Sequence, residues 1–239
     1  MEQINIPNGI TAITEHTFQL TGLTSIELPP SVTSLSTCAF QTASKLASIN
    51  LDNITEIKSW ALAETALTSV VIKNAQNLRE YSFYGCLELK SVVLESAQYL
   101  GNYSFQVCPE LESVVLGSAV QTGEWTFQNC TKLKKVTFPN NTLESIDLGA
   151  FSGCSSLESI VIPNSVRLLS EWAFEKTAIT EIFASWENPD DVITDVNIFG
   201  AGEGMIQFTW KVPENLKNAY GDEFLGYPVE VGVPETGNG

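Results

Sequence analysis

Four stretches of this chain decide its fold, because they repeat one pattern. They read SVVIKNAQNLREYSFYGC (residues 69–86), SVVLESAQYLGNYSFQVC (91–108), SVVLGSAVQTGEWTFQNC (113–130) and SIVIPNSVRLLSEWAFEK (159–176). Extended along the chain, the pattern places the starts of the repeats at Met1, Leu23, Leu46, Leu67, Leu89, Leu111, Leu133, Leu157 and Ile179. A period of about 22 residues predicts a solenoid, in which each repeat is one turn that buries its apolar face only against its neighbours.

The first residues of each repeat predict a short strand, because apolar and polar side chains alternate there with β-branched enrichment. In the turn that opens at Leu89, we expect Leu89, Val92 and Leu94 in the core and Ser91 and Val93 on the outside. Strands stacked turn on turn run parallel, about 4.8 Å apart. Eight or nine of them would form one continuous sheet.

The repeat pattern divides the chain into three parts. Residues 1–185 are predicted to form the solenoid, and residues 186–231, which include Phe208, Trp210 and Tyr220, a C-terminal capping region. The last residues, 232–239, are predicted to be a disordered tail. Because Met1 already occupies the first position of a repeat, no segment covers the first turn, and we expect the chain to be a fragment or a processed form.

Composition excludes two classes of partner. The net charge is −16, and a surface of that sign repels nucleic acid and anionic membranes, whose phosphates require clustered Lys and Arg. No apolar run approaches the 18 or more residues that would predict a membrane span, so we expect no membrane insertion by this segment. Residues 1–25 also lack the pattern of a signal peptide.

Two buried columns are predicted along the solenoid. The first consists of large apolar residues: Phe18, Phe40, Leu62, Phe83, Phe105, Phe127, Phe151 and Phe174. The second lies three residues later: Thr21, Ala43, Thr65, Cys86, Cys108, Cys130, Cys154 and Thr177. Neighbouring cysteines would come within disulfide range, but identical side chains on adjacent turns point the same way, so we expect reduced, packed thiols. Ligands in a straight line also cannot surround zinc tetrahedrally.

The segment LESIVIPNSVRLLSEWAFEKT (157–177) resembles the BspA-like leucine-rich repeats of Treponema and Bacteroides surface proteins, and the likeness covers residues 1–185. Residues 208–213, with Tyr220 and Phe224, resemble the segment that ends such arrays. The resemblance implies an α/β or mainly β fold: a right-handed leucine-rich repeat solenoid with a parallel sheet face, about eight repeats and a C-terminal cap. It also implies an extracellular or cell-surface bacterial protein whose role is binding.

An aromatic column is the first candidate binding surface. Two residues before each large apolar residue stand His16, Cys38, Trp60, Tyr81, Tyr103, Trp125, Gly149 and Trp172. The four consecutive rings of Trp60, Tyr81, Tyr103 and Trp125 could grip a sugar or a protein. The alternative is a stack that stiffens the solenoid. We favour the stack, because a position two residues from a buried Phe faces the core if the segment is a strand.

The outward face of the sheet is the second candidate. Its central column includes Val71, Val93, Val115, Val161 and Phe183. Beside it lies a column that includes Ser69, Ser91 and Ser113. Contiguous exposed apolar area marks a binding surface more often than scattered residues do. The alternative is that β-branched residues simply favour strands.

Catalysis has little support in the sequence. The only histidine is His16, which nearly excludes Ser-His and Cys-His pairs and His-ligated metal sites. Asp190, Asp191 and Asp195 could offer oxygen ligands to calcium, but they lack the spacing of a calcium loop. We therefore predict no enzyme activity, no metal and no cofactor. The main hypothesis is a binding module for a protein or glycan; the alternative is a structural spacer or self-associating stalk of a larger surface protein.

Overall fold

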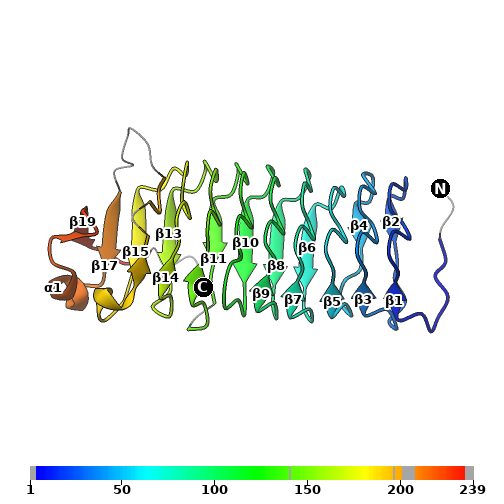
Figure 1. Ribbon diagram of the computed structural model, residues 1–239, viewed down its shortest axis with the longest axis horizontal. Coiled ribbons are helices and arrows are strands. Elements are labelled where there is room, and N and C mark those ends of the chain that lie inside the picture. The colour runs from blue at the N-terminus through cyan, green and yellow to red at the C-terminus, as the bar shows by residue number, and fades with distance from the viewer. Residues whose placement is uncertain (1–3, 140, 196, 201–207, 235–239) are drawn as a thin grey trace.

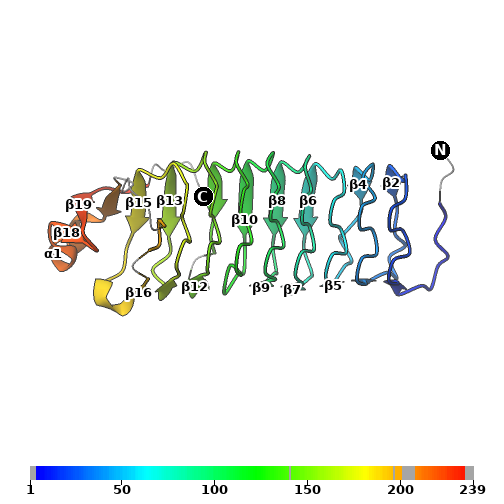
Figure 2. The same ribbon diagram turned by 45° about the horizontal axis from the view of Figure 1, so that its top comes forward.

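The protein was analysed as a computed structural model, which describes residues 4–139, 141–195, 197–200 and 208–234. The chain forms an elongated solenoid whose turns stack along one axis (Figures 1 and 2). In the described residues the only α-helix is α1 (Lys217–Tyr220). The fold is therefore mainly β, the second of the two classes expected from the sequence.

The principal ladder holds strands that the sequence predicts and two C-terminal strands that it does not, and neighbouring strands within each part of the ladder pair parallel. They are β2 (Ser25–Ile26), β4 (Ser48–Ile49), β6 (Ser69–Ile72), β8 (Ser91–Leu94), β10 (Ser113–Leu116), β11 (Lys135–Thr137), β13 (Ser159–Ile162), β15 (Glu181–Ala184), β17 (Thr209–Val212) and β19 (Tyr227–Val231). Burial alternates along β6, β8 and β10 as predicted, with Val92 and Leu94 in the core.

One continuous sheet was the wrong expectation. The ladder is divided into β2–β4, β6 to β11, and β13 to β19, with β18 (Glu223–Phe224) added antiparallel to β19. The divisions fall where repeat length departs from 22 residues, between Leu46 and Leu67 and between Leu133 and Leu157. Repeat length alone does not decide the pairing, because β2 and β4 pair Ser25 with Ser48 across a repeat of 23 residues. Residues 4–6 form no strand either, and Ile4 is 39% exposed, not inward.

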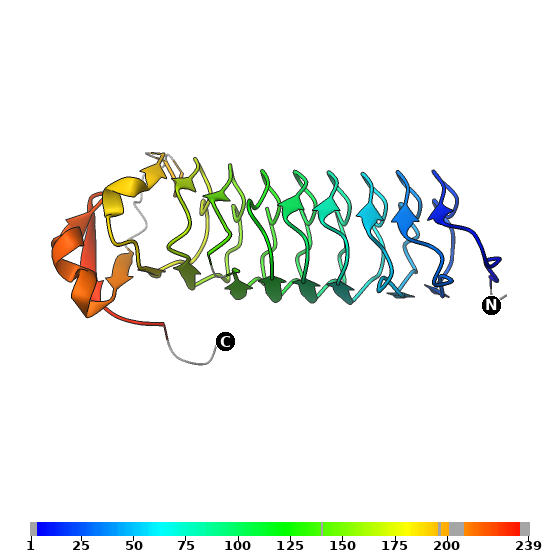
Figure 3. The same cartoon turned by 90° about the horizontal axis from the view of Figure 1, so that it is seen from below.

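A second parallel ladder, which we did not predict from the sequence, lies on the other side of the solenoid (Figure 3). Its strands are β1 (Ala12–Ile13), β3 (Ser34–Leu35), β5 (Glu56–Ile57), β7 (Asn77–Leu78), β9 (Tyr99–Leu100), β12 (Ser145–Ile146), β14 (Leu168–Leu169) and β16 (Ile193–Thr194). Gln121 bridges β9 and β12. Two residues with one inward side chain are too short for an alternating pattern, so the sequence signal was absent.

A third line of backbone hydrogen bonds joins the turns that precede each cysteine or threonine. In one turn the N–H groups of Tyr81, Phe83 and Gly85 donate to carbonyl oxygens of the next turn at 3.1, 2.8 and 2.9 Å. The backbone is left-handed at Tyr81 (φ 58°) and at Gly85 (φ 65°). The same two positions recur in the other turns, mostly with non-glycine residues, so local strain is accepted in exchange for the inter-turn bonds.

Both predicted core columns are buried. The rings of Phe83 and Phe105 stack with centroids 5.0 Å apart and an interplanar angle of 5°, and the stack continues through Phe127, Phe151 and Phe174. Phe18 and Thr21, both in the first turn, are partly exposed. Large rings therefore fill the centre of the solenoid in every turn except that of Leu62.

The cysteine column has a polar role that we did not foresee. The Sγ atom of Cys108 lies 3.5 Å from the carbonyl oxygen of Phe83, one turn earlier, and Cys130 is placed in the same way on Phe105 at 3.3 Å. Where threonine takes the position, as at Thr65, its hydroxyl donates to the carbonyl of its own turn. Cysteine and threonine each supply a small donor to a buried carbonyl group here, whereas Ala43 fills the same column without one.

The C-terminal segment closes the last turn with aromatic side chains. Trp186 Nε1 donates to the carbonyl of Val166 at 2.9 Å, and the backbone N–H of Trp186 donates to the Tyr220 hydroxyl at 3.0 Å. Burial raises the pKa of Tyr220 to about 12, so this hydroxyl stays protonated. Residues 232–234, assigned to the tail in the sequence analysis, continue from β19 with Gly232 N–H donating to Val212 O at 2.9 Å; residues 235–239 lie outside the described residues.

Gly149 provides a test of packing between turns. It has φ +58°, and a Cβ atom placed there would lie 2.2 Å from Cε3 of Trp125. We expect Gly149→Ala to cost about 3 kcal/mol, from the left-handed backbone and the displaced ring together. In a Trp125→Ala background the same change should cost only about 1 kcal/mol. Chemical denaturation of the four proteins measures this, and equal costs in both backgrounds would show that the ring is not the obstacle.

The cysteines should behave as five free thiols. Cys86, Cys108, Cys130 and Cys154 are buried and unpaired with one another, and burial raises the pKa of Cys86 to about 12. We expect these four to resist alkylation in the folded protein, Cys38 to react first, and reductant to leave stability unchanged. Cys108→Ala should cost roughly 1 kcal/mol. Counting three thiols or one under denaturing conditions would contradict the packing of reduced cysteines.

Candidate binding surface

The outward face of β6, β8 and β10 brings six of the predicted residues together. In-register pairing aligns Ser69 with Ser91 and Ser113, and Val71 with Val93 and Val115. Val71 is 43% exposed, and the outward positions of β8 and β10 are half-buried by their neighbours. We call this set the open strip: Ser69, Val71, Ser91, Val93, Ser113 and Val115. It is a flat, small-featured, partly apolar surface.

Lysines border the open strip at the start of its strands. The backbone of Glu112 donates to Lys90 O at 2.8 Å and that of Lys134 donates to Glu112 O at 3.0 Å, which continues the ladder beyond the serines. Lys135 pairs with Ser113 in the serine column. Among the residues that the structure describes, Lys90, Lys134 and Lys135 form no ion pair. These three exposed charges contrast with an otherwise strongly acidic chain.

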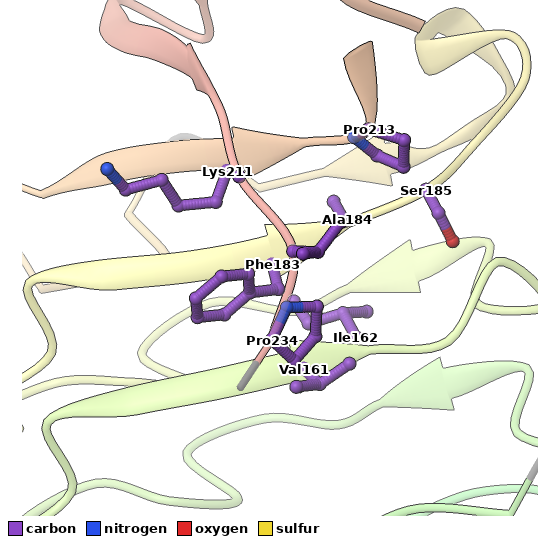
Figure 4. Close-up of a pocket in the computed structure, with 10 residues that line it drawn as sticks. Val161, Ile162, Phe183, Ala184, Ser185, Lys211, Pro213 and Pro234 are labelled. Atoms are coloured by element: carbon purple, nitrogen blue, oxygen red, sulfur yellow. The ribbon is translucent and has the colours of Figure 1, made fainter. Parts of the chain in front are cut away.

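Val161 and Phe183, the other two predicted residues of this face, lie apart from the open strip on β13 and β15. The chain after β19 crosses them, and a small pocket lies between the sheet and this crossing segment (Figure 4). The pocket is lined by Val161, Ile162, Phe183, Ala184, Ser185, Lys211, Pro213, Gly232, Val233 and Pro234. The predicted face is thus partly occupied by the protein itself at its C-terminal end.

The aromatic column forms two groups, not the four-ring line expected from the sequence. Trp60 stacks on Tyr81 (4.3 Å, 8°) and Tyr81 on Tyr103 (4.8 Å, 7°). Tyr84 packs edge-on against Trp60 and Tyr81. The pKa of Tyr81 is raised, mainly by its partial burial and to a smaller extent by the neighbouring phenol groups of Tyr103 and Tyr84. The two stacked contacts cover both faces of the Tyr81 ring and one face each of Trp60 and Tyr103, so these faces are not free to stack on a sugar.

Trp125 leaves the line because Gly149, one turn later, has no side chain. The Trp125 ring leans into that space and meets Trp172 with centroids 5.7 Å apart. The column also does not lie in strands, the condition under which its rings would face the core. The residues lie in turns with left-handed backbone, not in strands, and their rings are half-buried.

The acidic residues considered as calcium ligands do not form a metal-binding group in the described part of the chain. That part contains no group of three or more His, Cys, Asp or Glu side chains that could hold a metal ion. The carboxylate of Asp195 accepts from the backbone N–H of Glu171 at 2.9 Å, and that of Asp191 accepts from Asn188 Nδ2. These acids therefore satisfy local hydrogen bonds. Within the same residues no helix has the length and apolarity to cross a membrane.

Family membership follows from the repeats. The model for the BspA type leucine rich repeat region matches this sequence in six copies, over residues 1–90 and 76–189. The chain belongs to the BspA type leucine-rich repeat family. No curated protein matches the sequence.

Solved structures of bacterial leucine-rich repeat proteins are similar to this BspA type array. One from Bacteroides ovatus is 20% identical with a TM-score of 0.57, over 96% of this chain and 77% of that one. The Treponema pallidum protein TpLRR is 23% identical with a TM-score of 0.47, over 68% and 85%. A leucine rich cell surface protein from Faecalibacterium prausnitzii is 18% identical with a TM-score of 0.45, over 93% and 64%. The first likeness supports the fold alone.

Two features of this BspA type face were missed by sequence reasoning. One is the lysine border, whose signal was the basic run Lys132-Leu133-Lys134-Lys135 in an acidic chain. The other is the segment that crosses Val161 and Phe183, which lies outside the repeat and carried no periodic signal.

The stacked rings should act mainly in stability. Tyr81→Asn keeps a residue that tolerates the left-handed backbone but removes the ring, so we expect a loss of about 2 kcal/mol in the free energy of unfolding. Cys38→Asn is the matched control: it lies at the same position of an earlier turn, with φ 55°, and should change stability by less than about 0.5 kcal/mol. Equal effects of the two changes in denaturant titrations would refute a structural role for the stack.

Proposed function

We propose that this chain is a non-enzymatic binding module that engages a protein partner through the open strip. The observation that supports this proposal most directly is the in-register alignment of Val71, Val93 and Val115 beside three serines on β6, β8 and β10. Such a surface offers apolar contact without deep pockets, which suits the flat, closely packed interfaces between proteins. An extracellular or cell-surface location is part of the same proposal and is supported by the family resemblance.

A protein partner is favoured over a glycan by the state of the aromatic rings. Sugar recognition would use exposed ring faces, and here stacking covers both faces of Tyr81 and one face each of Trp60 and Tyr103. The open strip itself carries no aromatic residue. Serine hydroxyls and valine side chains on a regular sheet instead suit contact with polypeptide.

The alternative, a structural spacer or self-associating stalk, is favoured by one observation: the valine and serine columns are uniform from turn to turn. A spacer requires nothing else of its surface. The lysine border is not uniform, since the position of Lys90 and Lys134 holds Thr68, Glu112 and Glu158 in neighbouring turns, and that of Lys135 holds serine in most turns. Departures from the repeat of this kind support a binding role.

The proposal is tested by screening immobilised extracellular proteins and glycans with the wild type and with a Val93→Glu/Val115→Glu variant. Glutamate fits this column, because Glu27 occupies it in the turn of β2. We expect a protein ligand whose binding falls at least about tenfold in the variant, since charge on a buried contact is costly. Tyr99→Glu, on the second ladder and 44% exposed, is the control and should bind normally.

Three outcomes would contradict the proposal. A ligand that binds the Val93→Glu/Val115→Glu variant as tightly as the wild type would move the site elsewhere. A glycan ligand that depends on the open strip would change the class of partner. Concentration-dependent self-association in analytical ultracentrifugation, combined with no ligand in the screen, would establish the stalk instead.

A further inference from the structure

We infer that the open strip takes an extended, proline-containing peptide segment of its partner, in which apolar residues are flanked by acidic ones. Residues 232–234 of this chain, which follow β19, show in cis how such a segment lies on the outward face. The inference rests on the proposed function and narrows it, because it names the kind of polypeptide that the strip recognises.

The crossing segment is the first observation. After β19 the chain continues as Gly232-Val233-Pro234 and lines the pocket together with Val161 and Phe183. Figure 4 shows Pro234 lying over the side chains of Val161 and Phe183. Val161 remains 42% exposed, so the segment lies across the face without sealing it. The outward face therefore accepts an extended polypeptide that is not one of its own repeats.

The backbone of the crossing segment can lie close to the sheet because the segment contains glycine and proline. A Cβ atom on Gly232 would lie 3.0 Å from Cδ of Lys211, so glycine lets the backbone lie against the aliphatic stem of that lysine. Pro234, two residues after Gly232, restricts the conformations of the free chain, so less entropy is lost when the segment is held extended. A partner segment with the same residue types would bind with the same advantages.

Acidic residues stand on both sides of the apolar part of the segment. Glu230, just before the segment, accepts a hydrogen bond from Lys211 Nζ at 2.7 Å, and Lys211 occupies the outward column next to Phe183. Glu230 belongs to β19, so this pair joins neighbouring strands and holds a carboxylate beside a lysine on the outward face, just before the crossing residues begin. Glu235 follows Pro234 in the sequence, so the apolar core of the segment has an acidic residue on each side.

The open strip also combines an outward apolar column with neighbouring lysines, and no segment of the described residues covers it. Val71, Val93 and Val115 belong to the same outward column as Val161 and Phe183. Lys135 lies beside that column in β11, and neither it nor Lys90 nor Lys134 is used in an ion pair within the described ranges. Apolar contact beside unpaired lysines fits a segment whose valines and proline are flanked by carboxylates.

The probe for this inference is a capped synthetic peptide of residues 229–235, VEVGVPE, added to the full ¹⁵N-labelled chain. We expect saturable shifts in the amide signals of Val71, Val93, Val115 and Lys135, with an affinity in the millimolar range, since a short peptide contributes few contacts. A scrambled peptide should cause no such shifts. The Val93→Glu/Val115→Glu chain should bind the peptide no better than the scrambled control.

Charge reversal provides the matched test of the lysine border. Lys134→Glu/Lys135→Glu should weaken the peptide about threefold or more, and a peptide with both glutamates replaced by lysine, VKVGVPK, should regain binding to that variant. Shifts that are absent, that the scrambled peptide reproduces, or that ignore the charge swap would overturn the inference. A partner from the screen that still requires Val93 and Val115 would then leave the proposed function standing.

Discussion

Backbone hydrogen bonds between successive turns are the interaction on which the rest of this structure depends. They run in three lines: the principal ladder, the second ladder, and the left-handed turns in which Phe83 N–H donates to Ser104 O at 2.8 Å. Because each line pairs a residue with its counterpart one repeat later, every side chain lies over its equivalent. The columns of valine, phenylalanine and cysteine are consequences of that register.

Column packing limits what the interior can do. Identical side chains on adjacent turns point the same way, so Cys108 and Cys130 contact carbonyl groups and do not bridge. The same geometry leaves some groups without partners: the buried hydroxyls of Ser82 and Ser104 form no hydrogen bond, whereas Ala39 and Ala61 fill that column in earlier turns without a polar atom. The interior is therefore specialised for stacking and not for chemistry.

Specific recognition of a partner requires surface features that differ from one repeat to the next. The open strip supplies area and regularity, but a uniform surface cannot distinguish one partner from another. Specificity can enter through the lysines around β8 to β11 and through the segment that crosses Val161 and Phe183. Both lie on the same face of the principal ladder. The left-handed turns, which form the third line of inter-turn hydrogen bonds, carry the stacked rings of Trp60, Tyr81 and Tyr103.

The sequence by itself determined the solenoid, the inward and outward positions of β6, β8 and β10, and the buried phenylalanine and cysteine columns. This was possible because residues that recur at a constant spacing along the chain share a column. Only the tertiary structure decided the second ladder, the division of the sheet, the departure of Trp125 toward Trp172 and the crossing of Phe183 by residues 232–234. Periodicity carries no information on backbone conformation within a turn, on how a ring fills the space above a glycine, or on where a non-repeating segment returns to the sheet.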